Sequence, residues 1–398
     1  MIPKIDLEIG ISVYSTDFTG CGGKIRTTFE DFQVSEVLSK KVIDSISDEG
    51  NYAVYKLKKS GIDTTHSLSN IFKKHRIRLK SLGLKDASAV TEQFICSEHK
   101  TKSIDSISEK KYSIKKIGFV KKPLSKKDMI GNKFKIKIID VSDDLGKFND
   151  YEKILNFYGY QRFGSKRPVT HLIGKALLQK DYAKAITLLL TFTSKYDSTE
   201  NSQLREKLSD QSNYSKLLEE IPFQMDLERI AVTEMIKDDN PKNALRAIPL
   251  AIRRFYVQAY QSFLFNLTLS AAFTDGEDLF SPQEGDVCYD KNGLLGKFSN
   301  ISSQRLSVPF IGYSYYKKTR FNYQISKILE HEEITPKDFF LKDMQEVSNE
   351  GGFRNSSIQC DDVKANQNII TFTLSRGSFA TMVLREIMKP EDPILAGF

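Results

Sequence analysis

A Lys-Asp pair in a loop that begins with glycine is the first candidate for chemistry in this sequence. Residues 83–93 read GLKDASAVTEQ, and Lys85 stands directly before Asp86. An adjacent cation favours the ionised form of a carboxylate, which can act as a nucleophile or a general base. The same pair is also typical of a surface turn with a structural aspartate and a solvated lysine. Taken alone, the segment leaves both interpretations open.

Three further segments combine aromatic and polar residues. Residues 156–164 read NFYGYQRFG, which fits either a core strand or a platform on which a base stacks while Asn156 and an arginine supply hydrogen bonds. Residues 376–386, RGSFATMVLRE, fit an ordinary capped helix, and residues 30–36, EDFQVSE, fit an edge strand. Each segment by itself therefore has a purely structural explanation.

The sequence lacks the common motifs that bind a nucleotide cofactor or a metal. No GxxxxGK phosphate loop, GxSxG or HExxH pattern occurs, and residues 20–23, GCGG, lack the third glycine of a dinucleotide fingerprint. The five histidines and four cysteines are scattered without ligand spacing. We therefore expect no cofactor, no metal site and no disulfide framework.

Charge gives the first indication of a partner. The 398 residues include 59 Lys and Arg against 51 Asp and Glu, a net charge of +8, with the excess gathered in residues 73–85 and 110–127. Such a surface would attract a polyanion, although a solvated basic face is an equal alternative. The start lacks the apolar core of a signal peptide, and the most apolar stretch, residues 185–192, is shorter than the roughly 20 residues that cross a bilayer. We expect a cytoplasmic protein without membrane contact.

The first part of the chain has the periodicity of strands and a helix. Residues 51–58 and 134–139 alternate apolar and polar side chains, as half-buried strands do. Between them, Thr64 or Thr65 is expected to cap a helix. Bulky, β-branched strands with short turns favour an antiparallel or mixed sheet over a regular βαβ series.

The middle of the chain is more helical, and the end returns to the first style. Residues 171–190 and 252–273 have helical periodicity. Residues 369–374 are expected to form a strand, and a helix over 379–389 follows with Ser378 as its N-cap. The predicted class is α+β, with residues 1–167 and 346–398 forming one domain and residues 168–345 a mostly helical insertion.

The order of these segments resembles the TruD family of tRNA pseudouridine synthases. Its EDFxVxE, GLKDxxAxTxQ, NxxGxQRFG and GSxATxVLRE blocks all match, and residues 262–266 and 351–354 resemble two more. The matches extend from about residue 22 to residue 389. The resemblance implies the pseudouridine synthase catalytic fold with an inserted TRUD domain, and the isomerisation of a tRNA uridine without a cofactor.

The resemblance also implies roles for single residues. Asp86 falls on the essential aspartate of the family, whose carboxylate could attack the sugar or the base, or take a sugar proton to give a glycal. Lys85 would favour the ionised form if the two side chains approach each other. The target base must leave its stack to reach this carboxylate.

The remaining expected substrate-binding residues form the pocket around the base. Phe32, Tyr158 and Phe379 fall on the aromatic positions of the family, and Asn156 falls on its polar contact. Arg26 stands where a lysine is usual, and it keeps the charge. Tyr158 departs from the expected phenylalanine, and its hydroxyl could take part in removing the C5 proton or could order water. A further departure is Phe29, where a proline is usual.

Two other functions are compatible with the same residues. A non-catalytic RNA-binding protein or tRNA chaperone would use the basic and aromatic residues but would tolerate the loss of Asp86. A hydrolase that cleaves a nucleoside bond would need a water-activating partner near Asp86, and Glu92 is the acidic residue available in that segment. For the enzyme, the family suggests uridine 13 in the D arm of tRNA as the target, and we expect a monomer.

Overall fold

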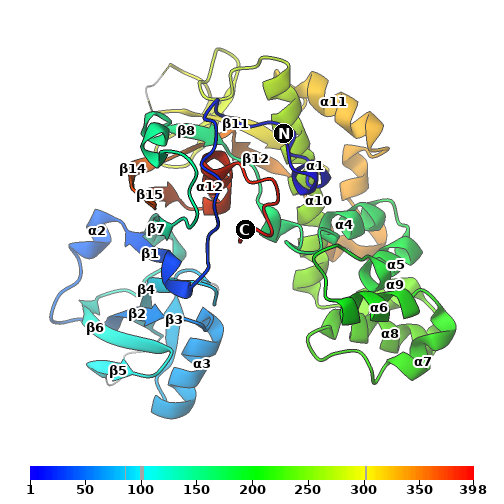
Figure 1. Cartoon of the computed structure of the whole chain (residues 1–398), viewed down its shortest axis with the longest axis horizontal. Helices are drawn as coiled ribbons and strands as arrows, with labels where there is room; N and C mark the ends of the chain where they lie inside the picture. Colours follow the sequence, from blue (N-terminus) through cyan, green and yellow to red (C-terminus); the bar gives the residue numbers. More distant parts are fainter. Residues whose placement is uncertain (86, 99–102, 301–302) are drawn as a thin grey trace.

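The computed structural model of the chain describes residues 1–85, 87–98, 103–300 and 303–398. Figure 1 shows a part built mainly from strands, coloured blue to cyan, and a part built from helices, coloured green. The yellow and red segments of the chain join the two parts. The predicted α+β class is confirmed.

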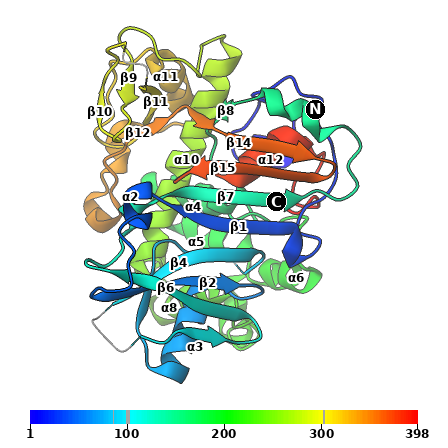
Figure 2. The ribbon, with the colours of Figure 1, turned by 90° about the vertical axis from the view of Figure 1, so that its left-hand side faces the viewer.

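The largest sheet in the described residues has nine strands. Eight of them follow the order β14-β15-β7-β1-β4-β2-β6-β5, and β3 pairs with β4. Strands β1 and β4 are parallel, whereas the other neighbours are antiparallel, so the sheet is mixed, as predicted. Figure 2 shows these strands in front of the helical part. The strands are β1 (Phe32–Leu38), β2 (Tyr52–Lys59), β3 (Leu79–Ser81), β4 (Val90–Ser97), β5 (Ser106–Ser108), β6 (Tyr112–Val120), β7 (Met129–Lys137), β14 (Asp361–Asn366) and β15 (Ile369–Ser375).

Alternation of side chains gives this sheet two unlike faces. In β7, Lys133, Lys135 and Lys137 are exposed, whereas Phe134 and Ile136 between them are buried. Successive side chains of a strand point to opposite faces, so the lysines share one face and the apolar residues share the other. The apolar face is therefore the one that packs against the rest of the chain.

The end of the chain returns to this sheet, because β15 pairs with β7. Phe372 lies opposite Phe134, and their rings stack with centroids 5.3 Å apart. Helix α12 (Ala380–Met388) follows, and all its residues are buried. Its N-cap is Phe379 and not the predicted Ser378, because Ser378 belongs to the preceding turn and donates its N–H to the carbonyl of Ser375.

A buried ion pair fixes α12 to the N-terminal helix α1 (Lys4–Glu8). Arg385 Nε donates to Asp6 Oδ2 at 2.6 Å, and both side chains are at most 1% exposed. The Tyr160 hydroxyl donates to the other Asp6 oxygen at 2.7 Å. The N-terminus thus holds together two segments that the sequence singles out, residues 156–164 and 376–386.

Helix α3 (Thr64–His75) packs on the apolar face of the sheet over β2. Ile71 of this helix packs with Tyr55 and Leu57 of β2 in one buried cluster. The helix was expected to be capped by Thr64 or Thr65, but its N-cap is Asp63, whose carboxylate accepts the N–H of His66. Helix α3 and helix α12 therefore lie on the same face of the sheet, over different strands.

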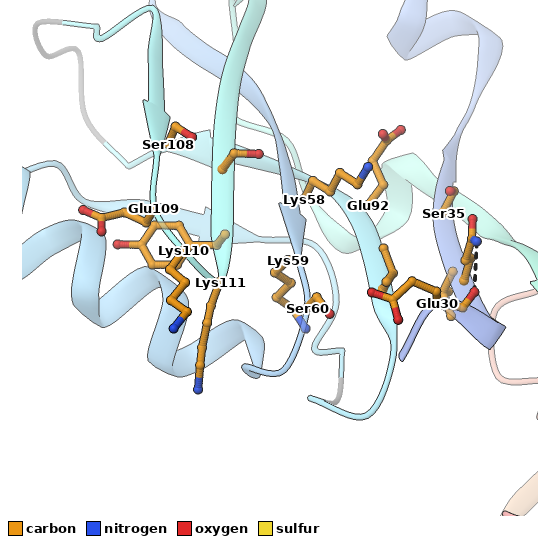
Figure 3. Close-up of a pocket in the computed structure, with 15 residues that line it drawn as sticks. Glu30, Ser35, Lys58, Lys59, Ser60, Glu92, Ser108, Glu109, Lys110 and Lys111 are labelled. Carbon is orange, nitrogen blue, oxygen red and sulfur yellow. Dashed lines mark hydrogen bonds between the residues drawn. The ribbon is translucent and has the colours of Figure 1, made fainter. Parts of the chain in front are cut away.

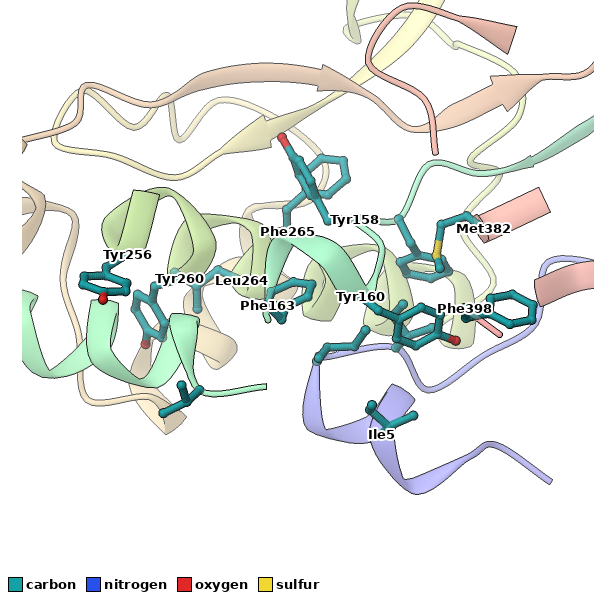
Figure 4. Close-up of a cluster of buried hydrophobic side chains, with 14 of the residues drawn as sticks. Ile5, Tyr158, Tyr160, Phe163, Tyr256, Tyr260, Leu264, Phe265, Met382 and Phe398 are labelled. Carbon is teal, nitrogen blue, oxygen red and sulfur yellow. The ribbon is translucent and has the colours of Figure 1, made fainter. Parts of the chain in front are cut away.

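Helix α10 (Leu250–Thr274) is the central helix of the helical part and confirms the helix expected over residues 252–273. Helix α4 (Thr170–Leu178) packs closely on it, because Gly174 has no Cβ to collide with the backbone carbonyl of Tyr256. Figure 4 shows the apolar core that continues from α10 to the segment around Tyr158 and Tyr160 and to Met382 of α12. The other helices of this part are α4 (Thr170–Leu178), α5 (Tyr182–Thr191), α6 (Thr199–Lys207), α7 (Tyr214–Leu217), α8 (Asp226–Asp238), α9 (Pro241–Ala247) and α11 (Asn322–His331).

Residues 171–190 form two helices instead of the single helical stretch expected. Helix α4 ends at Leu178, and Lys180 has a positive φ of 60°, which a helix does not tolerate. Asp181 then caps α5 by accepting the N–H of Lys184. In the described part of the chain, no helix is long and apolar enough to span a membrane.

Two small sheets connect the parts. Strand β12 (Gly352–Asn355) pairs with β11 (Arg305–Phe310). With β9 (Val287–Tyr289) and β10 (Leu295–Lys297), they form a four-stranded sheet of order β10-β9-β11-β12. Strand β13 (Ser357–Gln359) pairs with β8 (Lys153–Leu155). The pairing of β12 brings Arg354 to the segment that begins at Asn156. The domain limits predicted from the sequence stay a prediction.

Candidate active site

A cavity of about 490 Å³ lies between the apolar face of the large sheet, the start of α12 and the C-terminal residue Phe398. Leu84 and Lys85 line it on one side of position 86, and Ser88 and Ala89 line it on the other. Asp86 itself lies outside the described residues. The chain on both sides of the predicted catalytic residue therefore borders this cavity.

Four predicted site residues line the cavity: Arg26, Phe32, Lys85 and Phe379. They come from the segment before β1, from β1, from the segment before β4 and from the N-cap of α12. With Gln161 from residues 156–164 also at the cavity, the fold brings together residues from all four segments that the sequence singles out. The remaining lining residues are Val34, Leu84, Ser88, Ala89, Thr91, Asn132, Phe134, Gln161, Ser165, Ser378, Ala380, Thr381 and Phe398.

Arg26 and Phe32 form one side of the cavity as a stacked pair. The Arg26 guanidinium carbon lies 4.3 Å from the centroid of the Phe32 ring, and Nη1 donates to the carbonyl of Gly397 at 2.9 Å. The backbone of Arg26 has a φ of 58°, in the left-handed region that L-residues rarely adopt. A guanidinium stacked on an aromatic ring and tied to the C-terminal segment presents its charge in a fixed direction.

Lys85 directs its ammonium group to Glu36 of β1. Nζ donates to Glu36 Oε1 at 3.0 Å, and the Glu36 side chain is fully buried. Oε2 of the same carboxylate accepts the backbone N–H of Phe94 at 2.9 Å. Glu36 of β1 thus holds the Lys85 ammonium group in place, and the positive charge of Lys85 compensates the buried Glu36 carboxylate.

Tyr158 lies behind Phe379 and not among the residues that line the cavity. It is 7% exposed, and its ring contacts those of Phe379, Phe265 and Phe310 at 5.7 to 5.9 Å. Asn266 of α10 accepts the Tyr158 N–H at 2.8 Å and donates to its carbonyl at 3.2 Å. Tyr158 therefore supports the aromatic wall from the side of the helical part.

Asn156 lies in the same supporting layer, and its amide is engaged with the protein. Nδ2 donates to the carbonyl of Asn355 at 2.8 Å, and Oδ1 accepts from Arg354 at 2.7 Å. The Arg354 guanidinium also donates to the carbonyl of Gly377 at 3.0 Å and stacks on Tyr158 at 4.0 Å. Burial lowers the pKa of Arg354 below its ordinary value. Arg354 thus joins the segment of Asn156 to the turn that precedes Phe379.

Glu92 lies on the face of the sheet opposite the cavity. Its neighbours Thr91 and Gln93 in β4 are buried on the apolar face, whereas Glu92 forms an ion pair with Lys56 at 2.8 Å. A hydrolase that used Glu92 to activate water has no support from this placement. Within the described residues, no group of three or more His, Cys, Asp or Glu side chains is placed to hold a metal ion.

Three lining residues carry polar atoms suited to a polar ligand. Thr91 Oγ1, Asn132 Oδ1 and Thr381 Oγ1 are buried without a hydrogen-bond partner in the part of the chain that the structure describes. Buried polar atoms of a native protein are nearly always paired, so unpaired ones at a cavity favour a ligand with donors and acceptors. Aromatic walls with such atoms are typical of pockets for a nucleic acid base.

Comparisons with known proteins identify the family of the chain. The chain matches the family described as tRNA pseudouridine synthase D (TruD) over residues 8–387. It belongs to the TruD family. Similar proteins named "Probable tRNA pseudouridine synthase D" are 30% identical in Pyrobaculum islandicum and 31% identical in Pyrobaculum neutrophilum, each over 100% of this chain and 99% of the relative. A TruD crystal structure from Methanosarcina mazei superimposes with a TM-score of 0.81 at 26% identity and covers 99% of both chains.

Two residues that organise this TruD site were not assigned a role from the sequence. Glu36 follows Phe32 and Val34 on the buried face of β1. A carboxylate at a position where the alternation predicts an apolar residue is the sequence signal that could have identified it. Arg354 lies in the GGFR segment that resembles a family block, but no spacing indicates its distant partners Asn156 and Gly377. Contacts between segments so far apart in sequence become visible only in the folded chain.

Proposed function

We propose that this TruD family member converts uridine 13 in the D arm of tRNA into pseudouridine and that Asp86 is its essential residue. Family membership makes the protein a tRNA pseudouridine synthase, which is an isomerase. The observation that carries the proposal is the cavity itself: residues flanking position 86 border the same space as Phe32 and Phe379. A carboxylate at this position would meet a base enclosed by aromatic rings.

The reaction balances without a cofactor. The bond between sugar C1′ and ring N1 breaks, the base turns, and a bond forms between C1′ and C5. The proton on C5 is lost and N1 gains one, so substrate and product are isomers. Both attack by a carboxylate and removal of a sugar proton start from the ionised form of Asp86.

The cavity suits a base that has left its stack. Ligand pockets usually measure roughly 300 to 1,000 Å³, and this one measures about 490 Å³. Stacking on an aromatic side chain contributes roughly 1–3 kcal/mol per base, which helps to offset the cost of unstacking. Arg26, stacked on Phe32, lines the cavity and would place a positive charge beside the phosphate or the sugar of the flipped nucleotide.

We further propose that the protein works on tRNA as a monomer in the cytoplasm. All four cysteines are free and buried, which suits a reducing compartment. Burial raises the pKa of the Cys21 and Cys360 thiols to about 12, which keeps them protonated and unreactive.

The test is to incubate the purified protein with unmodified tRNA transcripts, without added cofactor, and to map pseudouridine chemically. We expect one modified position, uridine 13. A transcript with cytidine at position 13 is the matched control and should remain unmodified. Pseudouridine at another position would refute the assigned target, and an absence of pseudouridine on every transcript would refute the proposed activity.

A further inference from the structure

Lys59 is a buried lysine beside the candidate active site. It is the last residue of β2 and shares the apolar face of that strand with Tyr55 and Leu57, at 1% exposure. Lys58 and Lys59 both line a hollow of about 460 Å³ at this end of the sheet. Figure 3 shows the two side chains leaving the strand in different directions. Lysines are almost never fully buried, so the position of Lys59 requires an explanation.

The Lys59 ammonium group binds the backbone next to Asp86. Nζ donates to the carbonyl of Lys85 at 3.0 Å and to the carbonyl of Ile62 at 2.9 Å. The Lys85 carbonyl belongs to the peptide unit that joins Lys85 to Asp86. A buried positive charge is thus in direct contact with the peptide unit that carries the proposed catalytic residue.

Two neutral residues hold the same loop from below. Thr64 Oγ1 accepts the N–H of Lys85 at 3.0 Å and donates to Gln93 Oε1 at 2.8 Å. Gln93 Nε2 in turn donates to the carbonyl of Gly83 at 3.0 Å. Both side chains are at most 1% exposed. Together with Lys59, they bind both polar groups of the Lys85 backbone, so the loop is fixed immediately before Asp86.

Lys85 itself is less suited to supply the positive charge at Asp86. Its ammonium group binds the buried carboxylate of Glu36 at 3.0 Å and is thereby directed to β1. Charge near a carboxylate acts most strongly where water is excluded, and Lys59 is more deeply buried than Lys85. The lysine expected from the sequence therefore differs from the one that the contacts favour.

We propose that Lys59 is a positioning residue, which fixes the peptide of Asp86 and keeps its carboxylate ionised for the reaction. This inference rests on the proposed function. A catalytic group must be held by contacts that are already formed before the substrate binds, and a displacement of about 1 Å can cost about 100-fold in rate. Lys59 provides such a contact through a main-chain carbonyl, and it adds a charge that Thr64 and Gln93 cannot supply.

The test compares Lys59→Met, Lys59→Arg and the matched control Lys58→Met in single-turnover reactions with a tRNA that the wild type modifies, across an acidic to neutral pH series. Lys59→Met is expected to react about 100-fold more slowly, with tRNA affinity changed less than about threefold. The acid limb of its pH–rate profile should move to higher pH by about one unit, because the Asp86 carboxyl ionises less readily without the Lys59 charge. Lys59→Arg should keep the wild-type acid limb, and the exposed Lys58→Met should resemble the wild type.

Normal turnover of Lys59→Met would overturn the inference, and so would a slower reaction with an unmoved acid limb. If Lys59→Met does not fold, as judged by its circular dichroism and melting temperature, Lys59→Gln carries the same test, because it keeps a donor but loses the charge. A wild-type protein that forms no pseudouridine on any tRNA would refute the proposed function instead. The two failures are therefore distinguishable.

Discussion

At the scale of single residues, the candidate site has two layers. Arg26, Phe32 and Phe379 line the cavity, whereas Asn156 and Tyr158 lie behind it. The second layer determines where the first can be, because side chains in contact with a substrate must be held by their neighbours. The sequence indicates both layers through family resemblance but does not separate them.

Arg354→Met should slow pseudouridine formation about 10-fold or more with little change in tRNA affinity. The substitution removes the hydrogen bonds to Asn156 Oδ1 and to the carbonyl of Gly377, so the turn before Phe379 loses its connection to Tyr158. Single-turnover rates and a melting temperature measure the effect, and Arg305→Met, an exposed arginine on the neighbouring strand, is the control. An unchanged rate in a folded Arg354→Met variant would contradict this account of the wall.

At the scale of elements, the strongest periodic patterns were correct and the boundaries were not. The strand expected over residues 51–58 is β2, but it continues to Lys59. Lys59 is charged and yet buried, so the alternation of apolar and polar residues does not predict its place in the strand. The helix expected over residues 171–190 divides at Lys180, because a left-handed residue ends one helix before Asp181 caps the next. Periodicity reports which face is buried, whereas caps and turns depend on single residues.

Helix α4 carries a pH-dependent contribution to stability at His171. The imidazole stacks on Phe263 with centroids 4.9 Å apart, and burial lowers its pKa from 6.5 to about 4. Protonation therefore favours the unfolded chain, and stability is lost as the pH falls from about 6.5 toward 4, by about 3 kcal/mol at most. Urea unfolding of the wild type and of His171→Leu at several pH values measures this, and the wild type should lose more stability on acidification. Equal losses would show that His171 does not titrate in this way.

At the scale of the whole molecule, the cavity is assembled from distant parts of the chain. Arg26, Lys85, Gln161, Phe379 and Phe398 all border it. The sequence predicted the α+β class, the mixed sheet and the blocks that contribute to the site. It could not predict the hydrogen bonds of Glu36 and Arg354 or the bond from Lys59 to the Lys85 carbonyl, because these join residues whose separation in sequence follows no local pattern.

The distribution of positive charge is also a feature of the whole molecule. The basic segments include exposed Lys73 and Lys74 on α3 and exposed Lys110 and Lys111 before β6, all in the strand-rich part of the molecule. These lysines lie outside the cavity, so an RNA that reaches the cavity would contact positive charge apart from the residues that line it. We therefore expect that tRNA binding and pseudouridine formation can be altered separately.

The most direct test of the account is to compare the wild type with Asp86→Asn on full-length tRNA and to measure both pseudouridine formation and tRNA affinity. The account predicts that Asp86→Asn forms no detectable pseudouridine while its dissociation constant stays within a few-fold of the wild-type value. The substitution removes the carboxylate but leaves the aromatic wall and the basic surface intact. Continued formation of pseudouridine by Asp86→Asn would contradict the assigned role of this residue.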